Sequence, residues 1–221
     1  MKHALDLLVD SNSDSTVYRD AMYLLGTNLA AQLNKQLPTG VSISLAGTAE
    51  DIDFLAKGIW EALALRFDKM FLNVFWNKRF TPSPENGIAV APILKEFHDE
   101  GYAKSDVLII VKSIIATSCV IRTNLNRLIE TTNPMEIFVV SPVMYKNART
   151  ELEKEFPEEI SNRFQYVYFA IDDDIDKDGM VRPGIGGDVY LRLGLGNQDA
   201  KNRFTPELVL KRRQNNMQKV H

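Results

Sequence analysis

The stretch VLIIV at residues 107–111 constrains the fold more than any other part of this sequence. All five residues are apolar, so a strand formed here has no polar face to turn toward water. Strands that are buried on both faces occur almost only in parallel sheets with helices on both sides. We therefore expect an α/β protein with a mainly parallel sheet and helices on both of its faces.

Helix-like and strand-like stretches alternate along the chain, as such a sheet requires. Spacing of the apolar residues predicts helices at 15–36, 48–67, 121–130 and 145–156. Strands are expected at 41–47, 69–77, 107–111, 135–143 and 164–171, with an extended segment at 87–97. Thr48 and Asp51 match a capping box at the start of the second helix. No internal repeat is found, and a length of 221 residues suits one α/β domain, alone or with a small appendage.

The loop after the VLIIV strand is the first candidate for a functional site. Lys112 and Ser113 follow the strand, and Ala-Thr-Ser-Cys at 116–119 precedes a predicted helix. A helix N-terminus offers unpaired N–H groups and a partial positive charge, which favour an anion. Thr117 and Ser118 would add hydroxyl donors. Ser and Thr are also ordinary helix caps, so an anion-binding loop and a simple cap both fit these residues.

The wider sequence around this loop resembles a known family. VLIIVKSIIATSCVIRTNLNRL resembles the phosphoribosyltransferase signature, in which a hydrophobic strand leads through acids to Ala-Thr-Gly-Gly and a helix. The order and spacing of the residues after the strand are most similar to those of the uracil phosphoribosyltransferases. Similarity continues, over about residues 16–196, in TVYRDAMYLLGTNLAAQL, MEIFVVSPVMYKNARTELEKEFP and YFAIDDDIDKDGMVRPGIGGD.

This resemblance implies a phosphoribosyltransferase-type fold with a small hood or hairpin. It implies one such domain at 1–196 and a basic C-terminal extension at 197–221, beyond the family's usual end. It also implies a reaction between 5-phosphoribosyl 1-pyrophosphate (PRPP), bound with Mg²⁺, and a pyrimidine base. The phosphate and ribose contacts would come from Lys112, Ser113, Ala116, Thr117, Ser118 and Cys119. The base contacts would come from Ile171, Gly184, Ile185, Gly186 and Asp188, and a PRPP-binding arm would contribute Lys78 and Arg79.

The chain departs from the family pattern at the positions that carry the chemistry. Lys112 stands where the family has an acid, and an ammonium group cannot accept hydrogen bonds from a ribose diol. A cation there also has the wrong sign to stabilise a developing positive charge. Ser118 and Cys119 replace two glycines of the phosphate loop. Where the family's pyrophosphate loop would lie, SLAGTAED lacks an Arg and carries Glu50 and Asp51.

These departures predict a degenerate PRPP site. We expect a non-catalytic or repurposed protein, a regulator or assembly partner, that binds a nucleotide or another phosphorylated metabolite. The alternative is an active phosphoribosyltransferase that makes a nucleoside monophosphate from PRPP and a base such as uracil. No cofactor follows from the residues themselves, and Mg²⁺ is expected only if PRPP binds.

Other features of the sequence favour structural roles. The run from Asp174 to Gly179 begins like a calcium loop, but its twelfth position is Ile185 rather than Glu, so a polar turn is favoured and no metal site is expected. The single cysteine, Cys119, is interpreted as a buried structural thiol, because the three histidines are scattered. The basic tail, with Lys211, Arg212, Arg213 and Lys219, would either contact a partner protein or form a solvated helix end.

Bulk properties set the expected surroundings of the protein. A net charge of −3 argues against a nucleic-acid partner. No apolar stretch approaches the roughly 20 residues that a membrane span needs. We therefore expect a cytoplasmic protein, a homodimer by analogy with the family, with no membrane partner.

Overall fold

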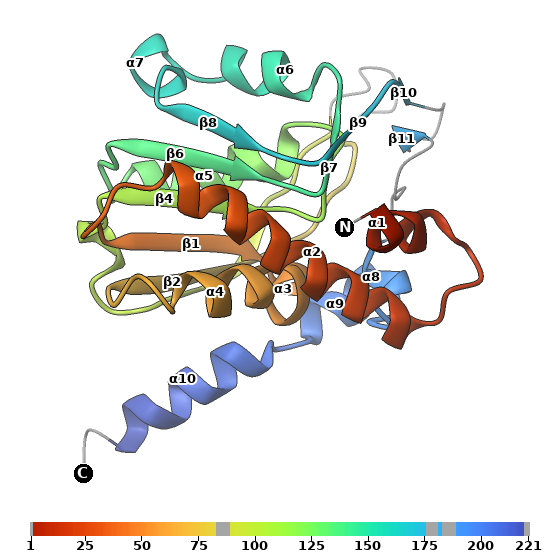
Figure 1. Ribbon diagram of the computed structural model, residues 1–221, viewed down its shortest axis with the longest axis horizontal. Coiled ribbons are helices and arrows are strands. Elements are labelled where there is room, and N and C mark those ends of the chain that lie inside the picture. The colour runs from red at the N-terminus through yellow and green to blue at the C-terminus, as the bar shows by residue number, and fades with distance from the viewer. Residues whose placement is uncertain (1, 83–88, 176–180, 183–188, 219–221) are drawn as a thin grey trace.

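The computed structural model describes residues 2–82, 89–175, 181–182 and 189–218 (Figure 1). Its main sheet has six strands in the order β3-β2-β1-β4-β6-β8. The strands are β1 (Ile43–Thr48), β2 (Met70–Asn77), β3 (Ile93–His98), β4 (Val107–Val111), β6 (Glu136–Val140) and β8 (Phe164–Val167). Only β3 runs antiparallel to its neighbour, so the predicted α/β fold with a mainly parallel sheet is confirmed.

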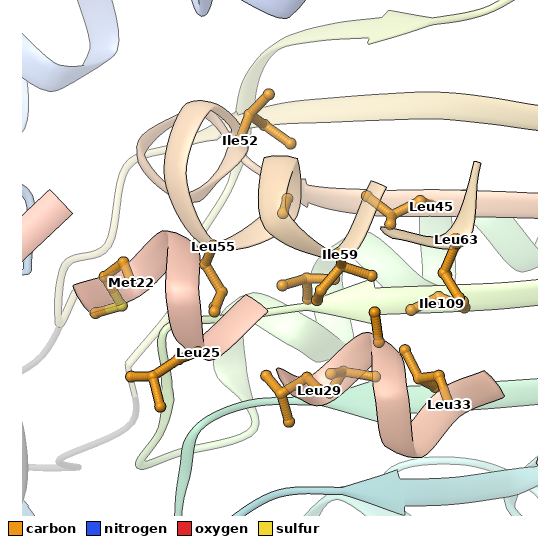
Figure 2. Packing of buried hydrophobic residues seen from close by; sticks show 14 of the residues in the cluster. Met22, Leu25, Leu29, Leu33, Leu45, Ile52, Leu55, Ile59, Leu63 and Ile109 are labelled. Atoms are coloured by element: carbon orange, nitrogen blue, oxygen red, sulfur yellow. The ribbon is translucent and has the colours of Figure 1, made fainter. Parts of the chain in front are cut away.

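Helices cover both faces of this sheet, as the VLIIV stretch predicts. Ile109 belongs to a core that also contains residues of α2 (Ser15–Gln36) and α4 (Lys57–Leu63). Ile110, its neighbour in β4, belongs to a second core that contains residues of α5 (Cys119–Ile129) and α6 (Ala148–Lys154). Figure 2 shows the first core, where leucines of α2 and α4 lie close to Leu45 and Ile109 of the sheet. Successive side chains of β4 thus enter opposite cores.

A second, smaller sheet continues three strands of the main sheet. β5 (Ile114–Ile115), β7 (Val143–Tyr145) and β9 (Ala170–Asp172) pair in parallel, and each follows β4, β6 or β8 after a two-residue break. The predictions of one continuous strand at 135–143 and another at 164–171 are therefore wrong, because each region forms two strands separated by a break. One break falls at Pro142, which has no N–H for a ladder and whose carbonyl accepts hydrogen bonds from Phe169 and Ala170.

The predicted helix at 48–67 is divided into three parts. These are α3 (Ala49–Asp51), a π-helical turn η1 (Ile52–Ala56) and α4. The predicted capping box is wrong, because no side chain caps the backbone of α3 and the Thr48 hydroxyl instead donates to the Asp51 carboxylate over 2.7 Å. Asp51 is therefore drawn into the contacts at the end of β1.

The remaining described elements lie at the ends of the chain and around the sheets. They are α1 (Lys2–Val9), η2 (Tyr102–Lys104), α7 (Glu158–Ser161), β10 (Asp174–Ile175), β11 (Val181–Arg182), α8 (Val189–Arg192), α9 (Gln198–Arg203) and α10 (Glu207–Gln218). β10 and β11 form a small antiparallel pair. Within the described ranges, the helices are too short or too polar to cross a membrane.

The predicted C-terminal extension contacts the rest of the domain through α9 and α10. Val209 of α10 is fully buried. Arg212 lies over the ring of Trp60 and pairs with Asp99 at 2.9 Å. The carboxylate of Asp53 accepts hydrogen bonds from the first amides of α10. Figure 1 shows the last turns of α10 pointing away from the sheet.

Candidate functional site

The topology places the candidate site between β1 and β4. From β1 the chain continues to β2 and β3 on one side, and β4 then pairs with the other side of β1. Such a reversal is a topological switch point, where α/β proteins bind ligands beyond the carboxyl ends of the strands. Residues 49–51 follow β1 at this point, and residues 112–113 follow β4.

A buried group of four charged side chains occupies this switch point. Lys112 Nζ donates to Asp51 Oδ2 over 2.8 Å and to Glu50 Oε1 over 3.3 Å. Lys201 Nζ, from α9, lies 3.5 Å from Glu50 Oε2 and donates to the Asn77 carbonyl over 2.8 Å. Most exposed of the four is the Lys112 side chain, at 14%. We call Glu50, Asp51, Lys112 and Lys201 the ion cluster.

The ion cluster keeps its charged form because opposite charges outweigh the cost of burial. Burial acts to lower the pKa of Lys112, but Asp51 and Glu50 raise it above its usual value. Burial acts to raise the pKa of Glu50, but Lys112 and Lys201 hold it well below its usual range. The pKa of Lys201 is lowered by burial and by Lys112, and Glu50 offsets this only in part. With its proton tightly held, Lys112 is not suited to act as a general base or a nucleophile.

Three buried polar atoms in and beside the cluster have no hydrogen-bond partner among the described residues. They are Glu50 Oε2, Asp51 Oδ1 and Tyr18 Oη. Tyr18 comes from α2, and burial raises the pKa of its hydroxyl, with a further contribution from Asp51. Each carboxylate of the cluster thus has one oxygen bonded to Lys112 and one oxygen without a hydrogen bond among the described residues.

The predicted phosphate loop lies at the N-terminus of α5. Helix α5 begins at Cys119, and no side chain caps it, so the simple-cap interpretation of Thr117 and Ser118 is wrong. No backbone bond between described residues uses the amides of residues 116–119 as donors. These amides therefore keep their capacity to bind an anion.

Cys119 is buried, as predicted for a structural thiol. Burial raises the pKa of this thiol, and the positive charges of Arg79 and Arg122 partly offset the rise. Arg79, predicted in the PRPP arm, is exposed, and its backbone amide donates to Gln198 Oε1 over 2.6 Å. Lys78, the other arm residue, pairs instead with Asp199 at 3.3 Å.

The predicted base-binding residues are only partly described. Ile171 lies in β9, half exposed, and aligns across β7 with Ile115 of the loop after β4. The other four residues lie outside the described part of the chain, as does most of the segment that begins like a calcium loop: Gly184, Ile185, Gly186 and Asp188, with 176–179. Their roles stay predictions.

Sequence reasoning missed the contributions of Lys201 and Tyr18 to this site. Lys201 lies in a polar segment with no apolar periodicity, so nothing local marks it as buried. The pairing of Lys112 with Glu50 and Asp51 could have been predicted from the sequence. The two acids follow one predicted strand and the lysine follows another, and the ends of neighbouring parallel strands lie close together.

Comparison with known proteins supports the fold. The sequence matches no protein-family model and no curated protein. The AQ2163 protein from Aquifex aeolicus has a similar structure, with a TM-score of 0.70 at 16% identity over 87% of this chain and 92% of that one. At this identity the similarity shows a shared fold alone.

Two phosphoribosyltransferases overlap with the chain more loosely. A hypoxanthine phosphoribosyltransferase from Staphylococcus aureus has a TM-score of 0.44 at 16% identity, over 75% of this chain and 84% of that one. An adenine phosphoribosyltransferase from Thermoanaerobacter pseudethanolicus has a TM-score of 0.42 at 12% identity, over 66% of this chain and 80% of that one. Overlaps this loose have no bearing on activity.

Proposed function

We propose that this chain is a phosphoribosyltransferase-like protein that binds a phosphorylated metabolite at residues 116–119 and does not transfer a ribosyl group. The observation that carries this proposal is the position of Lys112 in the ion cluster. Lys112 follows β4, at the position where the phosphoribosyltransferases that this chain resembles have a ribose-binding acid. The Lys112 ammonium group is directed at Asp51 and Glu50.

The hydrogen bonds of Lys112 leave it little capacity for a ligand. An ammonium group has three donors and no acceptor. The described acceptors are Asp51, Glu50 and the Ser113 hydroxyl, the last at 3.3 Å. We therefore infer that Lys112 holds Glu50 and Asp51 in place beside the loop and does not contact the phosphate or ribose.

Loss of the acid has a direct consequence for catalysis. Each charge-assisted hydrogen bond to a ribose hydroxyl is worth about 1.5–3 kcal/mol. If two such bonds were made only in the transition state, their loss would slow transfer by about 10²- to 10⁴-fold. In addition, a lysine beside the sugar opposes the positive charge that develops on it.

The phosphate-binding half of the proposal is supported by the loop at the start of α5. Its amides are available, the helix dipole favours an anion, and Thr117 and Ser118 can donate from their hydroxyls. Arg122, in the first turn of α5, adds a positive charge, which Glu155 partly balances because the two side chains pair at 2.8 Å. A single phosphate monoester fits this set better than a diphosphate, because a second anion extending toward β1 would approach Glu50 and Asp51.

Mg²⁺ enters this proposal only as part of magnesium-bound PRPP. The two acids at the end of β1 are held by Lys112 and Lys201, so they do not form a free carboxylate pair for a hard cation. The described residues also contain no group of three or more His, Cys, Asp or Glu that could hold a metal.

Calorimetry and a turnover assay test the two halves separately. We expect ribose 5-phosphate or UMP to bind, and we expect no pyrophosphate release above background from PRPP, Mg²⁺ and uracil. Turnover at ordinary enzyme rates, about 1 s⁻¹ or more, would overturn the non-catalytic half and favour an active enzyme. Absence of heat with all three phosphorylated compounds would overturn the binding half.

A matched pair of threonine variants localises the site. Thr117→Val removes a hydroxyl from the loop and should weaken phosphate binding by about five-fold, the value of one ordinary hydrogen bond. Thr123→Val lies one turn into α5, where its hydroxyl is already bonded to the Cys119 carbonyl, and should leave the affinity unchanged. Equal effects of the two substitutions would argue against binding at residues 116–119.

A further inference from the structure

A line of hydrogen bonds crosses three strands of the main sheet and ends at His98. Asn73 of β2 donates from Nδ2 to Ser44 Oγ of β1 over 2.5 Å. On its other side, Asn73 Oδ1 lies 2.7 Å from Nδ1 of His98, which belongs to the edge strand β3. Because a carbonyl oxygen can only accept, His98 Nδ1 carries the proton of this bond. Ser44 and Asn73 are buried, so water does not compete for these contacts.

The second nitrogen of the His98 ring has no such partner. Nε2 is buried and makes no hydrogen bond with a described residue. In a neutral ring that donates from Nδ1, this nitrogen carries a lone pair. It lies 3.5 Å from Glu96 Oε2, a carboxylate oxygen that also has only lone pairs. The neutral ring thus sets two acceptors against each other, and a proton on Nε2 would make the contact attractive.

The Glu96 carboxylate is at the same time held by helix α5. Arg127 Nε donates to the same Oε2 over 2.9 Å, and Arg127 Nη2 donates to Oε1 over 2.6 Å. This bidentate pair joins α5 to the edge strand β3. A protonated His98 would therefore be a second cation at one carboxylate, and it would repel Arg127.

The remaining surroundings of the ring come from several elements. Tyr102 of η2 stacks on the ring with the centroids 4.4 Å apart. Titratable and charged side chains near the ring are Glu96 of β3, Tyr102 of η2, Arg127 and Glu130 of α5, and, at the adjoining chain positions 97 and 99, Arg213 and Arg212 of α10 with Asp99. Burial lowers the pKa of His98, Glu96 acts to raise it, and Arg127 lowers it further. The ring is therefore neutral at pH 7 and takes up a proton in acid.

We propose that His98 is a proton switch on the attachment of α5 to the edge of the sheet. Uncharged, it completes the line of bonds from Ser44 and leaves Glu96 to Arg127. Protonated, it donates from Nε2 to Glu96 Oε2 and weakens the hold of Arg127 on that carboxylate. Such coupling is reciprocal: because Arg127 opposes protonation of His98, protonation reduces the contribution of Arg127 by the same free energy. This inference involves no ligand and is independent of the proposed function.

A titration followed by the NMR signals of the imidazole C–H protons tests the contacts of the ring. His98→Asn identifies the signal among three histidines. Arg127→Gln should raise the midpoint, because a repelling charge is removed, and Glu96→Gln should lower it. Glu130→Gln is the matched control, since Glu130 pairs with Arg127 from the exposed side at 3.6 Å, and it should move the midpoint least. A midpoint that responds to neither Arg127→Gln nor Glu96→Gln would overturn the proposal.

The switch itself is tested by the loss of stability in Arg127→Gln at two pH values. Urea denaturation should give the full loss above the His98 midpoint and a smaller one a pH unit below it. The reduction should approach about 1.4 kcal/mol for each unit by which Arg127→Gln raises the midpoint. Glu96 stays mostly charged in this range, since its hydrogen bonds to Arg127 lower its pKa.

His98→Asn provides the background in which the switch is absent. The asparagine amide can still donate to Asn73 Oδ1, but it does not take up a proton. In this background the loss of stability in Arg127→Gln should vary less with pH than in the wild-type background. Equal variation in both backgrounds would assign the pH dependence to Glu96 alone and overturn the switch.

Discussion

Lys112 neutralises two carboxylates that lie almost completely out of water. Replacing it by methionine would keep much of the volume but leave Glu50 and Asp51 with only Lys201 nearby. Removing one partner of a buried ionic group typically costs about 3–5 kcal/mol, so we expect a loss of that size in the free energy of unfolding of Lys112→Met. Urea denaturation measures it, with Lys35→Met on the exposed end of α2 as control. A loss below about 1 kcal/mol would contradict a paired, buried lysine.

Glu50 should make the protein sensitive to acid. Its pKa in the folded protein is about 2, below the ordinary value of 4.5, so the charged form is favoured by folding. The resulting stabilisation, on the order of 3 kcal/mol, is fully present above about pH 4.5 and is lost as the pH falls toward 2. Glu50→Gln cannot titrate at this position, so the difference in unfolding free energy between wild type and variant should shrink over this range. A constant difference from pH 6 to pH 3 would refute the assignment.

These charges show what sequence reasoning reaches at the scale of single residues. Lys112, Glu50 and Asp51 stand out in the sequence as unusual for a phosphoribosyltransferase-like site. That they bind one another depends on β1 and β4 being neighbours, and the place of Lys201 depends on α9. Local patterns do not contain that information, because the contacts join residues that are distant in the chain.

At the scale of elements, a close crossing of two helices carries a clear expectation. A Cβ atom on Gly58 of α4 would lie 2.2 Å from the Tyr23 carbonyl oxygen of α2. The two backbones would have to separate, so Gly58→Ala should destabilise the protein by about 1–3 kcal/mol despite the better helix propensity of alanine. Thermal unfolding measures this, and an increase in stability would show that the crossing can relax freely.

Strand and helix positions followed from the apolar pattern because burial on both faces leaves a strong signal in sequences such as VLIIV. The interruptions did not follow from it. After their two-residue breaks, β7 and β9 pair with each other in the second sheet, and the π-helical turn η1 coincides with the close approach of Leu55 to Gly26. Apolar periodicity reports which side of an element is buried, and it is insensitive to one extra residue in a turn.

At the scale of the whole molecule, the domain boundary expected after residue 196 is the least secure inference from the sequence. The basic, polar composition of 197–221 is typical of an appendage. Yet this segment supplies Lys201 to the ion cluster, and the Phe204 carbonyl accepts a hydrogen bond from the Trp76 indole over 2.7 Å. Composition does not reveal such contacts, because each involves a single side chain or a single carbonyl.

Two truncations distinguish an appendage from an integral part of the fold. A chain that ends after Pro206 loses α10, with buried Val209 and the Arg212–Asp99 pair, and should lose about 1.5–3 kcal/mol of stability, the value of one buried aliphatic side chain. A chain that ends after Gly196 also loses Lys201, which leaves Glu50 with Lys112 alone. It should lose several kcal/mol more, since a buried carboxylate is then less well compensated.

Urea denaturation followed by tryptophan fluorescence measures both losses. Equal, wild-type stability of the two truncations would establish 197–221 as an appendage, whereas a large loss only in the shorter chain would place the true end of the domain beyond α9.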